Sequence, residues 1–85
     1  MPTVFFTTAL RRFLPTPSLE VEGATVGEAL AGVFRVQPAL RGYVLDDQGA
    51  LRRHVAVYVG GARAGLADPV GPRNEIHVFQ ALSGG

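Results

Sequence analysis

The stretch TVGEALAGVF, residues 25–34, carries the clearest periodic signal in the sequence. Its apolar residues recur at the i, i+3, i+4, i+7, i+8 spacing of one helix face: Val26, Ala29, Leu30, Val33 and Phe34. Thr25, followed three residues later by Glu28, forms a capping box that satisfies free amides of the first helical turn. Pro38 disfavours the helical conformation at Gln37, so the helix should end there. The sequence therefore predicts one amphipathic helix at the centre of the core.

Strands are predicted on both sides of this helix. Residues 3–8 are β-branched and aromatic, with Val4 and Phe6 on one face and Phe5 on the other. Residues 18–22 alternate between polar and apolar, as a half-buried strand does. Because the connection between these strands contains two prolines, it should be a long, irregular loop.

The second half of the chain contains further strands and turns. A long strand is predicted over residues 51–59, a tight Gly-Gly turn at 60–61, a short return strand at 62–64 and a last strand at 75–82. The pattern between Pro38 and Gly49 is weaker. We expect one helical turn over residues 39–41 ended by Gly42, a short edge strand over 43–45, and a turn at 46–49.

The order of these elements points to an α+β fold, with the helix packed on one face of a mixed sheet. A ferredoxin-like split fold would need a second long helix, and no second apolar stripe is present. The ubiquitin-like β-grasp is the small fold that accommodates one main helix and about five strands. We expect residues 1–82 to form this β-grasp domain and residues 83–85 to form a flexible tail that ends in Gly-Gly.

Composition excludes several classes of function. The 85 residues, 47% hydrophobic and 18% charged, are typical of one folded domain. The sequence contains no cysteine, which removes disulfides, thiolate metal sites and thiol catalysis. It has no long apolar run and no signal peptide, so we expect a cytoplasmic protein without a membrane partner. The net charge of +1 gives no electrostatic case for nucleic acid, and all eight basic residues are arginine, so no lysine is present for an isopeptide bond.

The last residues, Leu82, Ser83, Gly84 and Gly85, are a second candidate feature. Glycine adopts dihedral angles that other residues avoid, so such a tail can pass through a narrow slot. A terminal glycine carboxylate is also uncrowded, which suits a group that is activated inside another protein. Termini are often small and frayed, however, so the tail gains weight only from the scaffold that precedes it.

Several segments resemble the MoaD/ThiS sulfur carriers, such as the small subunit of molybdopterin synthase. They are residues 4–12, which end in Ala-Leu-Arg-Arg, the helix start at 25–30, the strand 55–59 with the Gly-Gly turn after it, and the terminal Gly84-Gly85. The resemblance spans nearly the whole chain. Arg12, residues 72–75 and residues 80–83 depart from the common pattern, and these departures bear on the subfamily more than on the family.

The resemblance implies that Gly85 is the reacting residue. A ubiquitin-activating-type adenylating enzyme would use ATP to adenylate it, and a sulfur donor would convert it to a thiocarboxylate. The acceptor implied first is a molybdopterin synthase large subunit, which acts in molybdenum cofactor biosynthesis. Thiamine, cysteine or tRNA thiolation, protein modification through Gly85, and a binding module with an inert tail remain open. On this view the chain binds no cofactor and acts as a co-substrate rather than as a stand-alone catalyst.

Side chains that could form a conventional catalytic or metal site are few. His54 and His77 have no cysteine near them in sequence and lack metal-ligand spacing, so no metal site is expected. Ser83 has no nucleophile-elbow context. Asp46 and Asp47 are most simply a solvated turn.

Strand alternation predicts a partner-binding surface. If the buried face of the sheet carries Val55, Val57, Ile76 and Val78, the opposite face carries Ala56, Tyr58, His77 and Phe79. An exposed apolar patch on a small protein usually marks an interface, and in ubiquitin-like proteins this face is the usual recognition surface. The alternative is that Phe79 or Tyr58 only covers the edge of the sheet.

Overall fold

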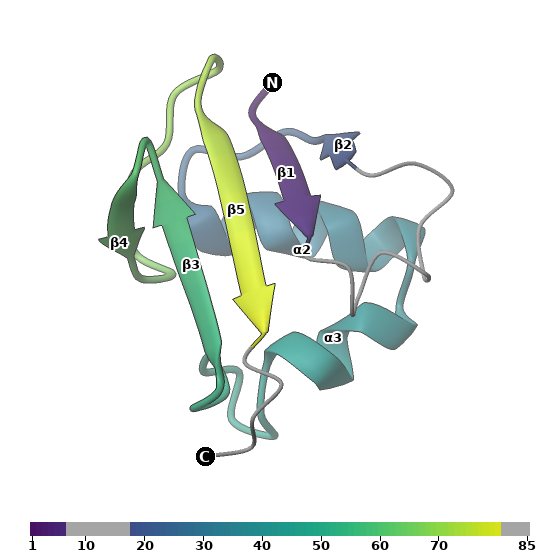
Figure 1. The fold of residues 1–85 in the computed structure, drawn as a ribbon. Coiled ribbons are helices and arrows are strands. Elements are labelled where there is room, and N and C mark those ends of the chain that lie inside the picture. The colour runs from purple at the N-terminus through teal and green to yellow at the C-terminus, as the bar shows by residue number, and fades with distance from the viewer. Residues whose placement is uncertain (7–17, 81–85) are drawn as a thin grey trace.

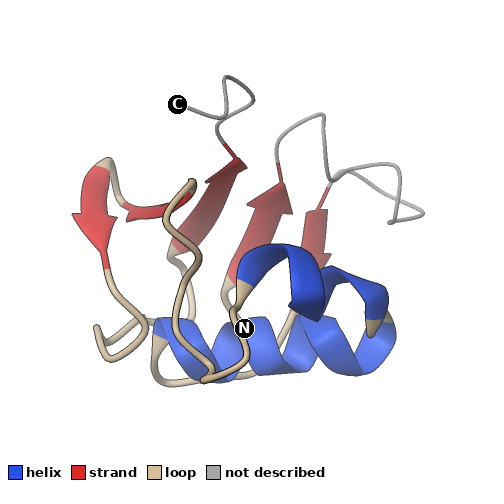
Figure 2. Ribbon diagram, turned by 90° about the horizontal axis from the view of Figure 1, so that it is seen from below, coloured by secondary structure: helices blue, strands red, loops and turns tan. Residues whose placement is uncertain are grey.

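The computed structural model describes residues 1–6 and 18–80 of the chain. In chain order the elements are β1 (Thr3–Phe6), β2 (Ser18–Glu20), α2 (Val26–Val36), α3 (Ala39–Val44), β3 (Val55–Val59), β4 (Ala62–Ala64) and β5 (Glu75–Gln80). The strands form one mixed sheet in the order β2-β1-β5-β3-β4. β1 and β5 pair in parallel at its centre, and the other neighbours are antiparallel. Both helices lie on one side of this sheet (Figures 1 and 2).

α2 begins after Thr25, the predicted N-cap, and the Glu28 side chain reaches back to the amide of the residue before Thr25. The Glu28 amide donates to Thr25 Oγ1 at 3.2 Å, and the Glu28 carboxylate accepts from the Ala24 amide at 2.8 Å. Two further amides of the first turn donate to the 65–70 segment: Val26 to the Asp68 carbonyl at 3.0 Å and Gly27 to the Leu66 carbonyl at 2.9 Å. The amides of Val26, Gly27 and Glu28 are therefore all satisfied by protein groups.

The core lies between α2 and one face of the sheet. The five apolar residues of the helix stripe are all buried, as predicted. Val4 and Phe6 of β1 face them, together with the buried residues of β3 and β5, Val55, Val57, Ile76 and Val78. The phases of β1, β3 and β5 predicted from alternation are therefore correct.

The segment after Pro38 differs from the prediction. Residues 39–44 form a single short helix that continues through Gly42, so the predicted edge strand over 43–45 is wrong. Leu40 and Val44, four residues apart, are both fully buried, and this burial outweighs the cost of a glycine inside a helix, about 1 kcal/mol. Leu45 makes only an isolated bridge to Leu51.

Strand boundaries also differ in places. The long strand predicted from residue 51 begins at Val55, because the Arg52 carbonyl accepts from the Val55 amide at 3.0 Å in a turn. The predicted Gly-Gly turn is present: Gly60 and Gly61 have φ of 59° and 85°, a conformation that favours glycine. Residues 7–8 and 81–82, predicted to extend the first and last strands, lie outside the described residues, as does the division between domain and tail at residues 82–83. Neither of the two described helices has the length and apolar character needed to cross a membrane.

Candidate partner-binding face

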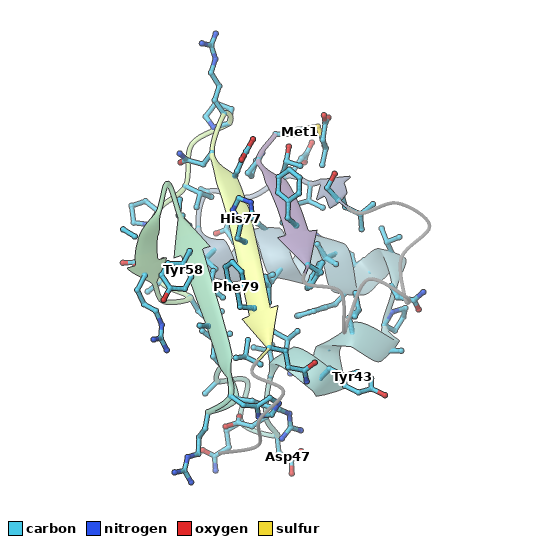
Figure 3. All side chains as sticks on the ribbon, viewed as in Figure 1. Met1, Tyr43, Asp47, Tyr58, His77 and Phe79 are labelled. Carbon is cyan, nitrogen blue, oxygen red and sulfur yellow. The ribbon has the colours of Figure 1, made fainter. Side chains whose placement is uncertain are left out.

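The sheet face opposite the helices carries a row of aromatic side chains. Pairing places His77 on the central strand β5 directly beside Phe5 of β1 and Tyr58 of β3. Phe79, the next residue of β5 on this face, lies beside Ala56. Figure 3 shows Tyr58, His77 and Phe79 next to one another on this face of the sheet. The four residues predicted as partner-binding are therefore brought together by two antiparallel strands.

The rings on this face hold one another in place. The His77 imidazole stacks on the Phe5 ring with centroids 4.8 Å apart and planes 9° apart. Tyr58 meets Phe79 edge-on, with centroids 5.5 Å apart and planes at 86°. Such aromatic pairs contribute roughly 0.5–1.5 kcal/mol beyond area burial. The face is thus a preorganised apolar surface rather than a set of independent side chains.

Much of this surface remains accessible to a partner. Phe79 is 44% exposed, and a shallow hollow beside it is lined by Ala56, Tyr58, Gly61 and His77. The only ion pair among residues 1–6 and 18–80 also lies here, with His77 Nε2 4.0 Å from Glu75 Oε1, and it carries opposite charges only when the imidazole is protonated. The arrangement suits docking of an apolar group and contains no nucleophile activated by a base.

Phe5 is a member of this face that sequence reasoning did not include among the partner-binding residues. Alternation along residues 3–8 places it opposite the core, and that signal was available. Its position beside His77 depends on the parallel pairing of β1 with β5. Those two strands lie near opposite ends of the sequence, so no local pattern reveals their contact.

The predicted tail residues Leu82, Ser83, Gly84 and Gly85 lie outside the described residues. The structure does place the strand that leads to them. β5 occupies the centre of the sheet and ends at Gln80, directly after Phe79. At this end, Gln80 Nε2 lies 3.3 Å from His54 Nε2.

Of the remaining candidate side chains, Asp46 has a structural role. Asp46 Oδ1 accepts from the backbone amides of Ala50 at 3.0 Å and Gln48 at 2.9 Å, and these hydrogen bonds lower the pKa of Asp46 below its usual 3.8. A carboxylate held in its charged form by a turn is not poised for acid–base work at neutral pH. Within the described part of the chain, no three His, Cys, Asp or Glu side chains come together as metal ligands.

Comparison with known proteins establishes the family. No protein-family model matches the chain. Small archaeal modifier protein 1 of Haloferax volcanii is 37% identical over 71 residues, which are 82% of each chain. The crystal structure of SAMP1 from Haloferax volcanii matches with a TM-score of 0.88 and 29% identity, over 99% of this chain and 98% of that one. A chain of the BexX/CysO complex from Amycolatopsis orientalis matches with a TM-score of 0.89 and 27% identity, over 100% of both chains. The chain therefore belongs to the family of small archaeal modifier protein 1 and has the ubiquitin-like β-grasp fold of the MoaD/ThiS-type sulfur carriers.

Proposed function

We propose that this protein is a sulfur carrier whose Gly85 α-carboxylate is adenylated by a partner enzyme and then converted to a thiocarboxylate. The thiocarboxylate donates its sulfur in cofactor biosynthesis. The proposal takes Gly85 to be the C-terminal residue of the mature protein, and the intact mass of the protein purified from its source checks this point.

The observation that carries the proposal is the continuity between the aromatic face and the tail. Phe79 lies on the open face, β5 ends one residue later, and the five residues 81–85 follow. Five residues span at most about 18 Å when fully extended. A partner that docks on Phe79, His77 and Tyr58 therefore has Gly85 within reach of an active site close to the docking surface.

The chemistry follows from the poor reactivity of a carboxylate, whose oxygen leaves badly. Attack of the Gly85 carboxylate on the α-phosphate of ATP releases pyrophosphate and forms an acyl-adenylate. A sulfide equivalent then attacks the acyl carbon, and AMP leaves with the C–O bond electrons. The adenylating enzyme supplies the ATP site and the acid–base groups, so the carrier needs only an accessible tail and a surface that the enzyme can bind.

The partners are therefore an adenylating enzyme of the ubiquitin-activating type, a sulfur donor and an acceptor enzyme. The solved BexX/CysO complex supports such an arrangement, because a relative of the same fold is held there by another protein. The acceptor we propose first is a molybdopterin synthase large subunit. The reason is that the small subunit of the same enzyme is one of the MoaD/ThiS carriers that this sequence resembles. A sulfur-transfer assay distinguishes among the pathways. Purified thiocarboxylate is offered a molybdopterin precursor, with a thiamine precursor, an activated serine and tRNA as competing acceptors.

Intact-mass spectrometry of four proteins tests the proposal. Each is incubated with the adenylating enzyme, Mg-ATP and sulfide. The wild type should gain the mass difference between one sulfur and one oxygen, located at Gly85. Removal of Gly85 should abolish the gain, because the carboxylate then ends roughly 3.3–3.6 Å short of the reactive site. A residue appended after Gly85 should also abolish it.

The fourth protein, Gly84→Val, separates binding from reaction. It should bind the enzyme like the wild type but react more slowly, because a β-branched residue resists dihedral angles that glycine adopts freely. An equal mass gain in the wild type and in the Gly85 deletion would remove the carrier hypothesis.

Conjugation of Gly85 to other proteins is a second candidate function. The observation that favours it is the 37% identity to a relative named as a modifier protein. An ATP-dependent ladder of tagged carrier on cellular proteins that disappears in the Gly85 deletion would support this function. A sulfur transfer assay that is positive while no ladder forms would support the carrier alone.

A further inference from the structure

The aromatic face carries charged residues at two separate places. Sheet pairing puts Glu20 of β2 and Glu75 of β5 on either side of Thr3, in the row just before Phe5 and His77. Directly paired residues point to the same side of a sheet, and Thr3 shares its side with Phe5. Arg63 of β4 lies opposite Tyr58, at the other edge of the same face. The face thus has carboxylates at one corner, aromatic rings in the middle and a guanidinium at the β4 edge.

These charges are available to a partner. Glu20, Arg63 and Glu75 are all exposed. Within residues 1–6 and 18–80, Glu20 and Arg63 make no ion pair, and Glu75 approaches only His77, at 4.0 Å. Their charges are therefore not used to stabilise the described fold, and substituting them should leave its core intact.

From this layout we infer that the open face orients its partner by charge, and that the partner has an apolar pocket flanked by a basic group facing Glu20 and Glu75 and an acidic group facing Arg63. The inference rests on the proposed function, because the partner is taken to be the adenylating enzyme. Phe79 and its neighbours alone would allow several rotations about the contact. The separated charges favour one rotation, since a half-turn would place like charges together.

Orientation matters because the tail leaves from one end of the face. β5 runs from Glu75, at the acidic corner, to Gln80, and the chain continues from there to the tail. A partner docked in the reverse sense would contact the same rings but hold its active site beyond the acidic corner, away from Gly85. The charges would thus couple correct docking to access of the tail.

A charge swap that preserves net charge tests the inference. Glu75→Arg combined with Arg63→Glu leaves the total charge unchanged and reverses the charge at one position on each side of the aromatic rings. Binding to the adenylating enzyme is measured without ATP, so that the chemistry of Gly85 does not enter. Each exposed pair contributes a few-fold in affinity, so losing two attractions and creating two repulsions should raise Kd on the order of ten-fold. The loss should appear in the association rate and should shrink at high salt.

A matched control comes from the helix side of the molecule. Glu22 and Arg35 border a hollow beside α2, away from the aromatic face, and both are exposed. Glu22→Arg with Arg35→Glu should keep Kd within about two-fold. A second swap on the aromatic face, Glu20→Arg with Arg63→Glu, leaves Glu75 and its contact with His77 unchanged. It should again weaken binding.

The outcomes separate this inference from the proposed function. Equal Kd values for the wild type and both swaps on the aromatic face would overturn the inference, even if Gly85 is adenylated. An equal loss in the helix-side control would also overturn it, because the effect would then not belong to this face. Swap-sensitive binding by an enzyme that never adenylates Gly85 would support the charge pattern and overturn the sulfur-carrier function.

Discussion

Two phenylalanines on opposite faces of the sheet allow a paired test of which residues hold the fold and which bind the partner. Phe6 is 4% exposed within the core, whereas Phe79 is 44% exposed on the aromatic face. The same substitution, Phe to Ala, is made at each position. Phe6→Ala should show the larger loss of stability, and Phe79→Ala should show the larger loss of binding.

The expected magnitudes follow from burial and contacts. Full burial of a phenylalanine stabilises by roughly 1.5–3 kcal/mol, and Phe79 retains only part of this. Its edge-on contact with Tyr58 adds about 0.5–1.5 kcal/mol, so Phe79→Ala should lower the free energy of unfolding by about 1–2 kcal/mol. Phe6→Ala also leaves a cavity, and its cost should be about 3–5 kcal/mol.

Urea denaturation measures the free energy of unfolding, and the curves of the two variants are comparable if their m-values agree. Titration with the adenylating enzyme, under conditions where each variant is folded, measures Kd. Phe79→Ala should raise Kd about ten-fold or more, as expected for an aromatic side chain central to an interface. Phe6→Ala should leave Kd within about three-fold, and Phe6→Leu replaces it if the alanine variant does not fold.

Two results would refute this reasoning. If Phe79→Ala costs as much stability as Phe6→Ala, the side chain of Phe79 belongs to the core and the assigned faces of β5 are wrong. If Phe79→Ala binds as tightly as the wild type while Gly85 is still adenylated, the enzyme docks elsewhere on the molecule.

Two further predictions concern the helix and the turn before β3. Leu30→Ala should lower the free energy of unfolding in urea by about 2–5 kcal/mol, since Leu30 is 1% exposed, and a loss below about 0.5 kcal/mol would contradict the packing of α2 on the sheet. Asp46→Ala should lower the melting temperature at pH 7 by removing the acceptor for two backbone amides. Because the pKa of Asp46 is lowered in the folded state, this stabilisation is present above about pH 4 and is lost as the pH falls through the lowered value. A melting-temperature difference that stays constant down to pH 2 would rule out this role.

Local patterns in the sequence predicted the features that depend on local contacts. The stripe from Val26 to Phe34 and the cap at Thr25 lie within one helix, so spacing alone identified them, and all five stripe residues are buried. The faces of β3 and β5 followed from alternation for the same reason. The resemblance to the MoaD/ThiS carriers then supplied the family, which the comparisons confirm.

The errors arose at a helix extended by tertiary burial, at a turn that the strand pattern hid, and at a pairing between distant strands. Gly42 was taken as a helix end, but Leu40 and Val44 are buried on either side of it and the helix continues. Arg52 was taken as part of a strand, but its carbonyl closes a turn before Val55. Phe5 was not assigned to the binding face because its neighbour His77 comes from the far end of the sequence. The roles of Gly84 and Gly85 stay predictions.

The central position of β5 has a consequence for synthesis of the protein. β5 is the last of the five described strands to be synthesised, and it inserts between β1 and β3. Until it does so, the β1–β2 and β3–β4 hairpins have no strand to join them, and His77 and Phe79 are missing from the face between them. Nascent, truncated or clipped chains that lack residues 75–80 therefore cannot present the docking surface. An enzyme that needs both this surface and the residues beyond it would act only on chains in which β5 has joined the sheet.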